Sequence, residues 1–131
     1  KQAIVIPGAV SVDRSYRWEH NWCWFSDEVT PALDKLEDKK KYSIIFSHSG
    51  PKPPCIVNDP GTDCGFFADC CKKDKNLLKD LEDEQMYWSN ALKEIAPERI
   101  YFGHYHCSED FEVDGVRCRV CDIGEIVPVI Y

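Results

Sequence analysis

Short apolar runs alternate with longer segments of mixed polarity along this chain of 131 residues. Three runs are too short for buried helices and are bounded by Gly, Pro or charged residues, so they predict buried strands at 3–6, 42–47 and 99–102. Residues 9–12 are interpreted as a second short strand. Residues 126–130 are interpreted as a last strand, which would lie at a sheet edge because it contains a proline.

Two helices are predicted between these strands. Apolar residues recur at helical spacing from residue 76 to residue 95, where Gln85 is the polar member of the stripe and Pro97 ends the pattern. Thr30 and Pro31 are typical of a helix start, with the threonine as N-cap. This first helix ends in a lysine run, which the helix dipole favours. The apolar positions of the two helices are Ala32, Leu33, Leu36, Leu78, Leu81, Trp88, Leu92 and Ile95.

Asp114-Gly115 joins two runs of alternating polarity and is the strongest hairpin signal in the chain. Residues 51–75 are rich in Pro, Gly and Cys, and they are predicted to form an irregular loop insertion. Strands alternating with helices and followed by a hairpin predict an α/β layered fold. We expect a mixed sheet with flanking helices and a C-terminal hairpin.

The composition narrows the possible partners. The length fits one domain, so residues 1–131 are expected to belong to a single unit. A net charge of −7 and a pI near 5.0 give a nucleic-acid backbone no electrostatic attraction, so no nucleic-acid partner is expected. No apolar stretch approaches the length of a membrane span, and no membrane association is expected.

Eight cysteines are an even number that would allow a disulfide framework, but the chain is rich enough in core residues not to need one. Cys118 and Cys121 have zinc-ligand spacing, yet residues three apart on a strand point to opposite faces. Free thiols in the cytoplasm are therefore expected. A disulfide or a small structural metal is an open alternative for the cysteines of the predicted loop, Cys55, Cys64, Cys70 and Cys71.

Three histidines follow directly from two of the predicted buried strands. His48 comes after the strand at 42–47, and His104 and His106 come after the strand at 99–102. The ends of strands in an open α/β sheet are where ligands bind. In an extended segment residues i and i+2 share a face, so His104 and His106 are expected to face one pocket, and Gly103 is expected to let the backbone approach a ligand. Imidazole at such a place is a candidate metal ligand.

Four pieces of the sequence together resemble the calcineurin-like metallophosphoesterases. Gly103-His104-Tyr105-His106 resembles the last signature of that family, G-H-x-H, and residues 47–51 resemble the isolated histidine that precedes it. Residues 8–14 and 24–28 resemble the middle of small bacterial or phage-type members. The resemblance covers the C-terminal half of such a domain, and it implies a layered α/β sandwich from a bacterial or phage-encoded protein.

The resemblance implies hydrolysis of phosphoric esters by water activated on two divalent metal ions, which would be Mn, Fe, Zn or Ni. By resemblance, His48 and His104 would serve one ion and His106 the other. The first three signatures of the family, D-x-H, G-D-x-x-[DG] and G-N-H-[DE], are not found in the chain. We therefore expect two partners, a phosphorylated substrate and a missing N-terminal half or complementing chain. The isolated chain is expected to be inactive.

Two alternatives stay open. In the first alternative, the chain is a catalytically inactive module that binds a metal or a partner protein. In the second, it is an α/β domain whose histidines have structural roles. A module of the first kind would use the aromatic segment 16–25, which is interpreted here as a cover over the core. The acidic residues nearest the last signature in sequence carry no feature that marks them as replacement ligands; they are Asp110, Asp122 and Glu125.

Overall fold

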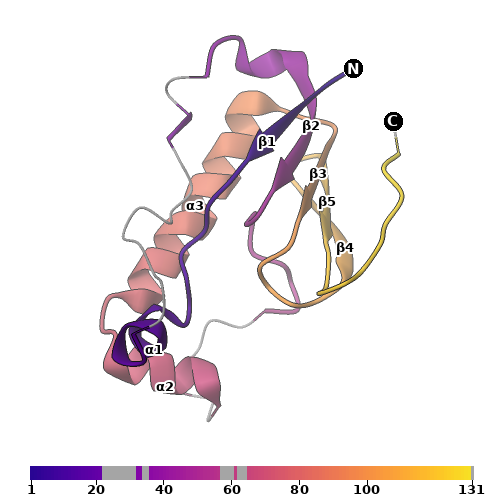
Figure 1. Ribbon diagram of the computed structural model, residues 1–131. Coiled ribbons are helices and arrows are strands. Elements are labelled where there is room, and N and C mark those ends of the chain that lie inside the picture. The colour runs from indigo at the N-terminus through magenta and orange to yellow at the C-terminus, as the bar shows by residue number, and fades with distance from the viewer. Residues whose placement is uncertain (22–31, 34–35, 57–60, 62–64, 131) are drawn as a thin grey trace.

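The computed structural model describes residues 1–21, 32–33, 36–56, 61 and 65–130. Its centre is a mixed sheet of five strands in the order β1-β2-β3-β5-β4 (Figure 1). The first four strands in this order are parallel, and β4 is antiparallel to β5 at the edge. The strands are β1 Gln2–Ile6, β2 Tyr42–Ser47, β3 Arg99–Phe102, β4 Glu109–Val113 and β5 Val116–Val120.

The predicted α/β class, mixed sheet and hairpin are confirmed. β2 and β3 have the predicted bounds, and β1 begins one residue earlier than the apolar run. The hairpin pairs Val113 with Val116, and its two turn residues, Asp114 and Gly115, have φ of 49° and 82°. Positive φ at both central residues is the requirement of the tight turn that matches strand twist, and the Asp-Gly pair meets it.

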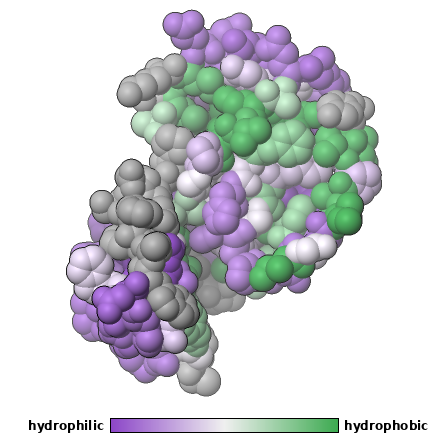
Figure 2. Space-filling view, in the orientation of Figure 1, coloured by the Kyte–Doolittle hydropathy of each residue, from purple (hydrophilic) through white to green (hydrophobic). Residues whose placement is uncertain are grey.

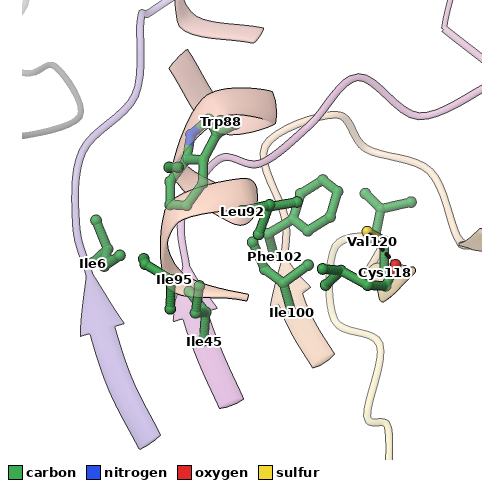
Figure 3. Close-up of a cluster of buried hydrophobic side chains, with 11 residues drawn as sticks. Ile6, Ile45, Trp88, Leu92, Ile95, Ile100, Phe102, Cys118 and Val120 are labelled. Carbon is green, nitrogen blue, oxygen red and sulfur yellow. Dashed lines mark hydrogen bonds between the residues drawn. The ribbon is translucent and has the colours of Figure 1, made fainter. Parts of the chain in front are cut away.

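Helix α3 (Leu77–Ile95) lies along one face of the sheet and supplies four of the eleven buried residues of the main core (Figures 1 and 3). Its Trp88 is fully buried, and alternate residues of the strands pack against the helix because side chains of a strand alternate between faces. Figure 3 shows the core members Ile6, Ile45, Trp88, Leu92, Ile95, Ile100, Phe102, Cys118 and Val120. The helix ends as predicted before Pro97, through Ala96 in the left-handed conformation.

The buried face of α3 differs from the prediction in its polar member. Glu84, not Gln85, is the buried polar residue, with 6% of its surface exposed. Leu77 is buried where the predicted stripe placed Leu78. The buried stripe is therefore shifted by one residue relative to the predicted stripe at these two positions. As a result, the carboxylate of Glu84 lies on the side of the helix that faces the sheet.

Residues 9–12 do not form the predicted strand. The chain leaves the sheet at Gly8, whose φ of 87° is the left-handed conformation that favours glycine, and enters helix α1 (Arg14–Glu19). Val10 instead packs in a second small core with Cys70, Leu77 and Leu81. The run of apolar residues at 9–12 is thus explained by contact with helices and not by strand pairing.

Helix α2 (Phe66–Lys73) lies inside the segment 51–75, so the prediction of irregular structure is wrong over this part. Its Ala68 and Cys70 are buried, and burial of this apolar face stabilises a helix that the Pro- and Gly-rich composition did not indicate. Residues 57–60 and 62–64 of the same segment lie outside the described residues.

Residues 126–130 form no strand in the structure. The backbone N–H of Ile130 donates to the hydroxyl of Tyr101 at 3.2 Å, and Pro128 has no N–H to donate to a ladder. The start predicted for the helix at Thr30 lies outside the described residues. The predicted apolar residues Leu33 and Leu36 do pack against the main core, and the lysine run forms the 3-10 helix η2 (Lys39–Lys41).

The aromatic segment is described only through residue 21, and residues 22–25 lie outside the described part. Within the described part, Trp18 is 73% exposed, so the prediction that this tryptophan covers the core is wrong. None of the described helices has the length and apolar character that crossing a bilayer requires.

Gly50→Ala should lower the free energy of unfolding by about 1–3 kcal/mol, as overpacked cores do. A Cβ at Gly50 would lie 2.6 Å from the ring of Phe102, which is 3% exposed and has no room to move. Urea unfolding measures the effect. Gly103→Ala is the matched control, because its Cβ would lie 3.9 Å from the nearest atoms, and it should change the unfolding free energy by less than about 0.5 kcal/mol. Equal losses in both variants would contradict this packing.

Candidate functional site

The loops that follow β1, β2 and β3 meet at one edge of the sheet, because these strands are parallel. Together with α1, α2 and α3 they enclose a pocket of about 780 Å³. An open sheet places its ligand site at this same edge. The residues that line the pocket are Gly8, Ala9, Ser11, Val12, Asp13, Arg17, His48, Cys55, Ile56, Phe66, Phe67, Leu81, Gln85, His104, Tyr105 and His106.

The structure brings the three predicted histidines into this pocket. The rings of His48 and His104 lie 5.2 Å apart between centroids, with an angle of 58° between their planes. His104 is half-buried, whereas His48 and His106 are exposed at the mouth. The fourth histidine, His20, lies at the end of α1, where its ring stacks on Tyr16 and bonds to the Tyr16 carbonyl.

The backbone that presents these rings is not extended, so the predicted geometry of the segment is wrong. His104 and His106 have φ of 71° and 52°, which is the left-handed region that costs a non-glycine residue roughly 1–3 kcal/mol. Two left-handed residues, and not the alternation of a strand, therefore place both rings at the pocket. Gly103 has no left-handed φ and no close neighbour; its N–H donates to the carbonyl of His48 at 3.1 Å and joins the two histidine loops.

His104 is held in its neutral form. Its pKa is lowered from 6.5 to about 4, first by burial and then by the neighbouring His48 and His106. A hydrogen bond to the backbone of Val10 opposes the shift, and because it favours the protonated ring, the acceptor is the Val10 carbonyl. One ring nitrogen is thereby engaged as a donor, and the other keeps the lone pair that a cation or a proton needs.

Glu84 fixes the loops behind these histidines. One carboxylate oxygen accepts the backbone N–H of Val10 at 2.8 Å, and the other accepts the Ser49 hydroxyl at 2.9 Å. Ser49 is fully buried, and it directly follows His48. A single side chain of α3 thus holds both the segment that bonds to His104 and the segment that carries His48. Sequence reasoning could have found Glu84 from its spacing. It stands three residues after Leu81 and four before Trp88, which places it on the apolar side of the helix.

Tyr105 makes the next connection between the loops. Its hydroxyl donates to the carbonyl of Gly50 at 3.2 Å, and its ring packs edge-on against Phe102. Burial raises the pKa of Tyr105 to about 12, so its hydroxyl stays protonated and available as a donor at neutral pH. The residue between the two histidines of the last signature therefore positions the loop rather than facing solvent.

Two charged side chains face the pocket from the start of α1, and sequence reasoning missed both as site residues. Arg17 donates to Ser11 at 2.9 Å and lies 4.0 Å from Asp13. The helix is held in place by Arg14, whose guanidinium bonds to Asp74 and, at 2.7 Å, to Asp80 at the start of α3. The pocket is therefore lined by a guanidinium and a carboxylate as well as by the imidazoles.

The acidic residues nearest the last signature in sequence lie in another cluster. Arg119 bonds to Asp110 at 2.8 Å and to Glu125, and Glu125 also accepts from Ser108 at 2.9 Å. Glu125 further accepts the backbone N–H of Asp122 at 2.8 Å. None of the three carboxylates lines the pocket. No sequence feature marks them as ligands, and in the structure their hydrogen bonds are made outside the pocket.

Few side chains that could ligate a metal ion are brought together in the described residues. Among the described residues, no group of three or more His, Cys, Asp or Glu side chains is arranged to hold a metal ion. His48 and His104 suit one borderline cation by chemistry and proximity. Two ions would need further carboxylates, since neutral imidazoles do not offset the charge of two divalent cations.

Glu84→Gln should lower the free energy of unfolding by about 1–3 kcal/mol, because its amide group would point a donor at a group that already donates. Urea unfolding measures this loss, and hydrogen exchange at Val10 should become faster. Glu82→Gln is the matched control on an exposed position of the same helix. It should change the unfolding free energy by less than about 0.5 kcal/mol. Unchanged stability in Glu84→Gln would contradict the role assigned to this carboxylate.

The pKa of His104 predicts a loss of stability as the solution becomes acidic. The unfolded chain takes up this proton near pH 6.5, but the folded chain takes it up near pH 4. The unfolded state therefore binds more protons between these values. The free energy of unfolding should fall as pH drops through this window, by at most about 3 kcal/mol. Urea unfolding at a series of pH values between 7 and 4 checks the slope.

His104→Gln should flatten that slope, because glutamine does not titrate. His20→Gln serves as its control, since this ring lies outside the pocket and its loss should leave the slope unchanged. If the slope persists in His104→Gln, another group produces it.

A comparison of the chain with protein-family models, with curated proteins and with solved structures found no match. The metallophosphoesterase resemblance therefore rests on the motifs, and the function is inferred from the pocket.

Proposed function

We propose that this chain is part of a metal-dependent phosphoesterase and supplies its metal-ligand histidines His48, His104 and His106. The observation that carries the proposal is the shared pocket, in which these three imidazoles and the guanidinium of Arg17 meet at the carboxyl edge of a parallel sheet. In this proposal the site is completed by a second segment of protein that carries the missing carboxylate signatures.

The contacts of His48 and His104 support a shared ion. Their rings are neighbours, and the Val10 carbonyl orients the ring of His104, as outer-shell acceptors orient metal-binding histidines. His106 lines the same pocket, and in this proposal it would serve the second ion. Two bound ions, drawn from Mn, Fe, Zn or Ni, would polarise a phosphoryl oxygen and lower the pKa of a bridging water.

Arg17 supports an anionic substrate. A guanidinium matches the geometry of phosphate oxygens and offers several fixed donors. Its hydrogen bond to Ser11 and its ion pair with Asp13 hold it at the pocket wall. In the proposed enzyme Arg17 orients the phosphoryl group of the substrate while the histidines hold the cations.

An uncovered apolar surface supports the missing segment. Ile4 and Ile6 face the α3 side of the sheet, so Val5 between them faces the opposite side, where it is 73% exposed. Ile126 and Ile130 are 95% and 56% exposed. Figure 2 shows apolar surface gathered over the sheet and polar surface over α1 and α2. Exposed apolar area of this kind is typical of a surface that packs against another segment.

A second candidate is a module that binds one metal ion without catalysis. The observation that favours it is the donor count, since no arranged group of three donors occurs in the described part of the chain. The two candidates differ in one measurable property. The phosphoesterase gains activity when the missing signatures are supplied, and the module does not.

Ni²⁺ should bind to the chain with about one equivalent at pH 7, measured by titration calorimetry under reducing conditions. His48→Ala and His104→Ala should each weaken the binding at least about tenfold, because each removes a ligand that the other ring cannot replace. His20→Ala, outside the pocket, should bind as the unaltered chain does. Equal affinity in all four proteins would show that the histidines of the pocket are not ligands.

With p-nitrophenyl phosphate and Mn²⁺, the chain alone should show no hydrolysis above the metal blank. Addition of a polypeptide that carries the three missing signatures should raise the rate on the order of 10²-fold or more, because the carboxylates complete the electrostatic site. His104→Ala should abolish the gain. Substantial activity from the chain alone would mean that its ligands come from elsewhere in its own sequence, and no activity in either arrangement would favour the binding module.

A further inference from the structure

Two thiols meet at the mouth of the pocket. The Sγ atoms of Cys55 and Cys107 lie 3.0 Å apart, although the residues are 52 positions apart in the chain. Cys55 belongs to the loop after β2, and Cys107 directly follows His106 in the loop after β3. Both are free thiols in the structure. No local pattern in the sequence indicates this pair, because the two cysteines belong to different loops.

The other described cysteines lie in different surroundings. Cys70 and Cys118 are buried in the two cores, so an external oxidant does not reach them. Cys55 is exposed and Cys107 is half-buried. The Cys55 loop is held in position by its backbone N–H, which donates to Glu109 of β4 at 3.2 Å. A pair of close, reachable thiols on two anchored loops is the arrangement that a disulfide requires.

We propose that Cys55 and Cys107 form a reversible disulfide that ties the two histidine-bearing loops together at the mouth of the pocket. The sulfurs need to approach by about 1 Å to reach bonding distance. The oxidant is a small-molecule disulfide of the glutathione class, and a thiol of the same class reverses the reaction.

The exchange balances in two steps. The thiolate of one cysteine attacks a sulfur of the small disulfide, so that a mixed disulfide forms and one small thiolate leaves. The second cysteine then attacks the protein sulfur of the mixed disulfide, and the second small thiolate leaves. The two protons lost by Cys55 and Cys107 end on the two released thiols. The pKa of Cys55 is raised to about 12, chiefly by Cys107 and then by Glu109, so the exchange is slow at neutral pH.

The bond would restrain the pocket. Cys55 is a lining residue, and His106 is the immediate neighbour of Cys107. A link between residues so far apart in sequence removes much of the freedom of the unfolded chain. The oxidised form is therefore more resistant to heat, and the loop that carries His106 moves less. An effect on metal affinity would rest on the proposed function, whereas the bond itself does not.

To test the proposal, the purified chain is incubated with oxidised glutathione for hours and the remaining thiols are alkylated. Disulfides are then mapped by peptide mass spectrometry. A Cys55–Cys107 peptide is expected, with loss of two hydrogens from the intact chain. The melting temperature should rise by about 5 °C or more on oxidation and return on reduction. Cys55→Ser and Cys107→Ser should each abolish both changes, and Cys121→Ser, a half-buried cysteine outside the pocket, should keep them.

A bridge from Cys55 to another cysteine, a bond only between chains, or a stable mixed disulfide at Cys55 would each overturn the proposal. Differential alkylation of the unaltered chain gives the same answer if a serine variant does not fold. The Ni²⁺ titration of the histidine variants is run on the reduced chain, so failure of the proposed function and failure of the disulfide are separate results.

Discussion

The carboxylate of Glu84 is the contact on which the pocket depends. It leaves the middle of α3 on the side that faces the sheet and accepts hydrogen bonds from Val10 and Ser49, which follow two different strands. A buried carboxylate without such donors would cost several kcal/mol. Because both donors come from loops, the same requirement that satisfies Glu84 also sets where those loops lie. The helix, the sheet and the site are coupled through one side chain.

The hydrogen bonds of Glu84 also determine where the histidines lie. Val10 is held by Glu84 and accepts a hydrogen bond from His104, while Ser49 is held by Glu84 and places His48 next to it. Gly103 and Tyr105 add two further bonds between the loops, to the carbonyls of His48 and Gly50. The left-handed backbone of His104 and His106 persists because the loops around it are fixed in this way. Strain of this kind collects at sites where side chains must point in a direction that regular structure does not allow.

The side chains that line the pocket provide little negative charge, and this limits the chemistry that the pocket can support. A neutral imidazole, a guanidinium and a carboxylate face one space, while the carboxylates nearest in sequence are satisfied around Arg119. Such a pocket offers ligands to a cation and a donor to an anion, but it offers little negative charge to balance two cations. The exposed apolar side of the sheet is consistent with a second segment that would contribute both packing and charge.

The sequence by itself determined the strands at 42–47 and 99–102, the long helix, the hairpin and the residues that follow each strand, because these depend on local periodicity and on one turn dipeptide. That the histidines meet could also be expected, since parallel strands end at the same edge. Only the tertiary structure decided that Glu84 lies inside, that Val10 packs against helices, and that Cys55 lies beside Cys107. Burial of a charge and contact between distant loops depend on the partners that folding brings near, and no local pattern encodes those partners.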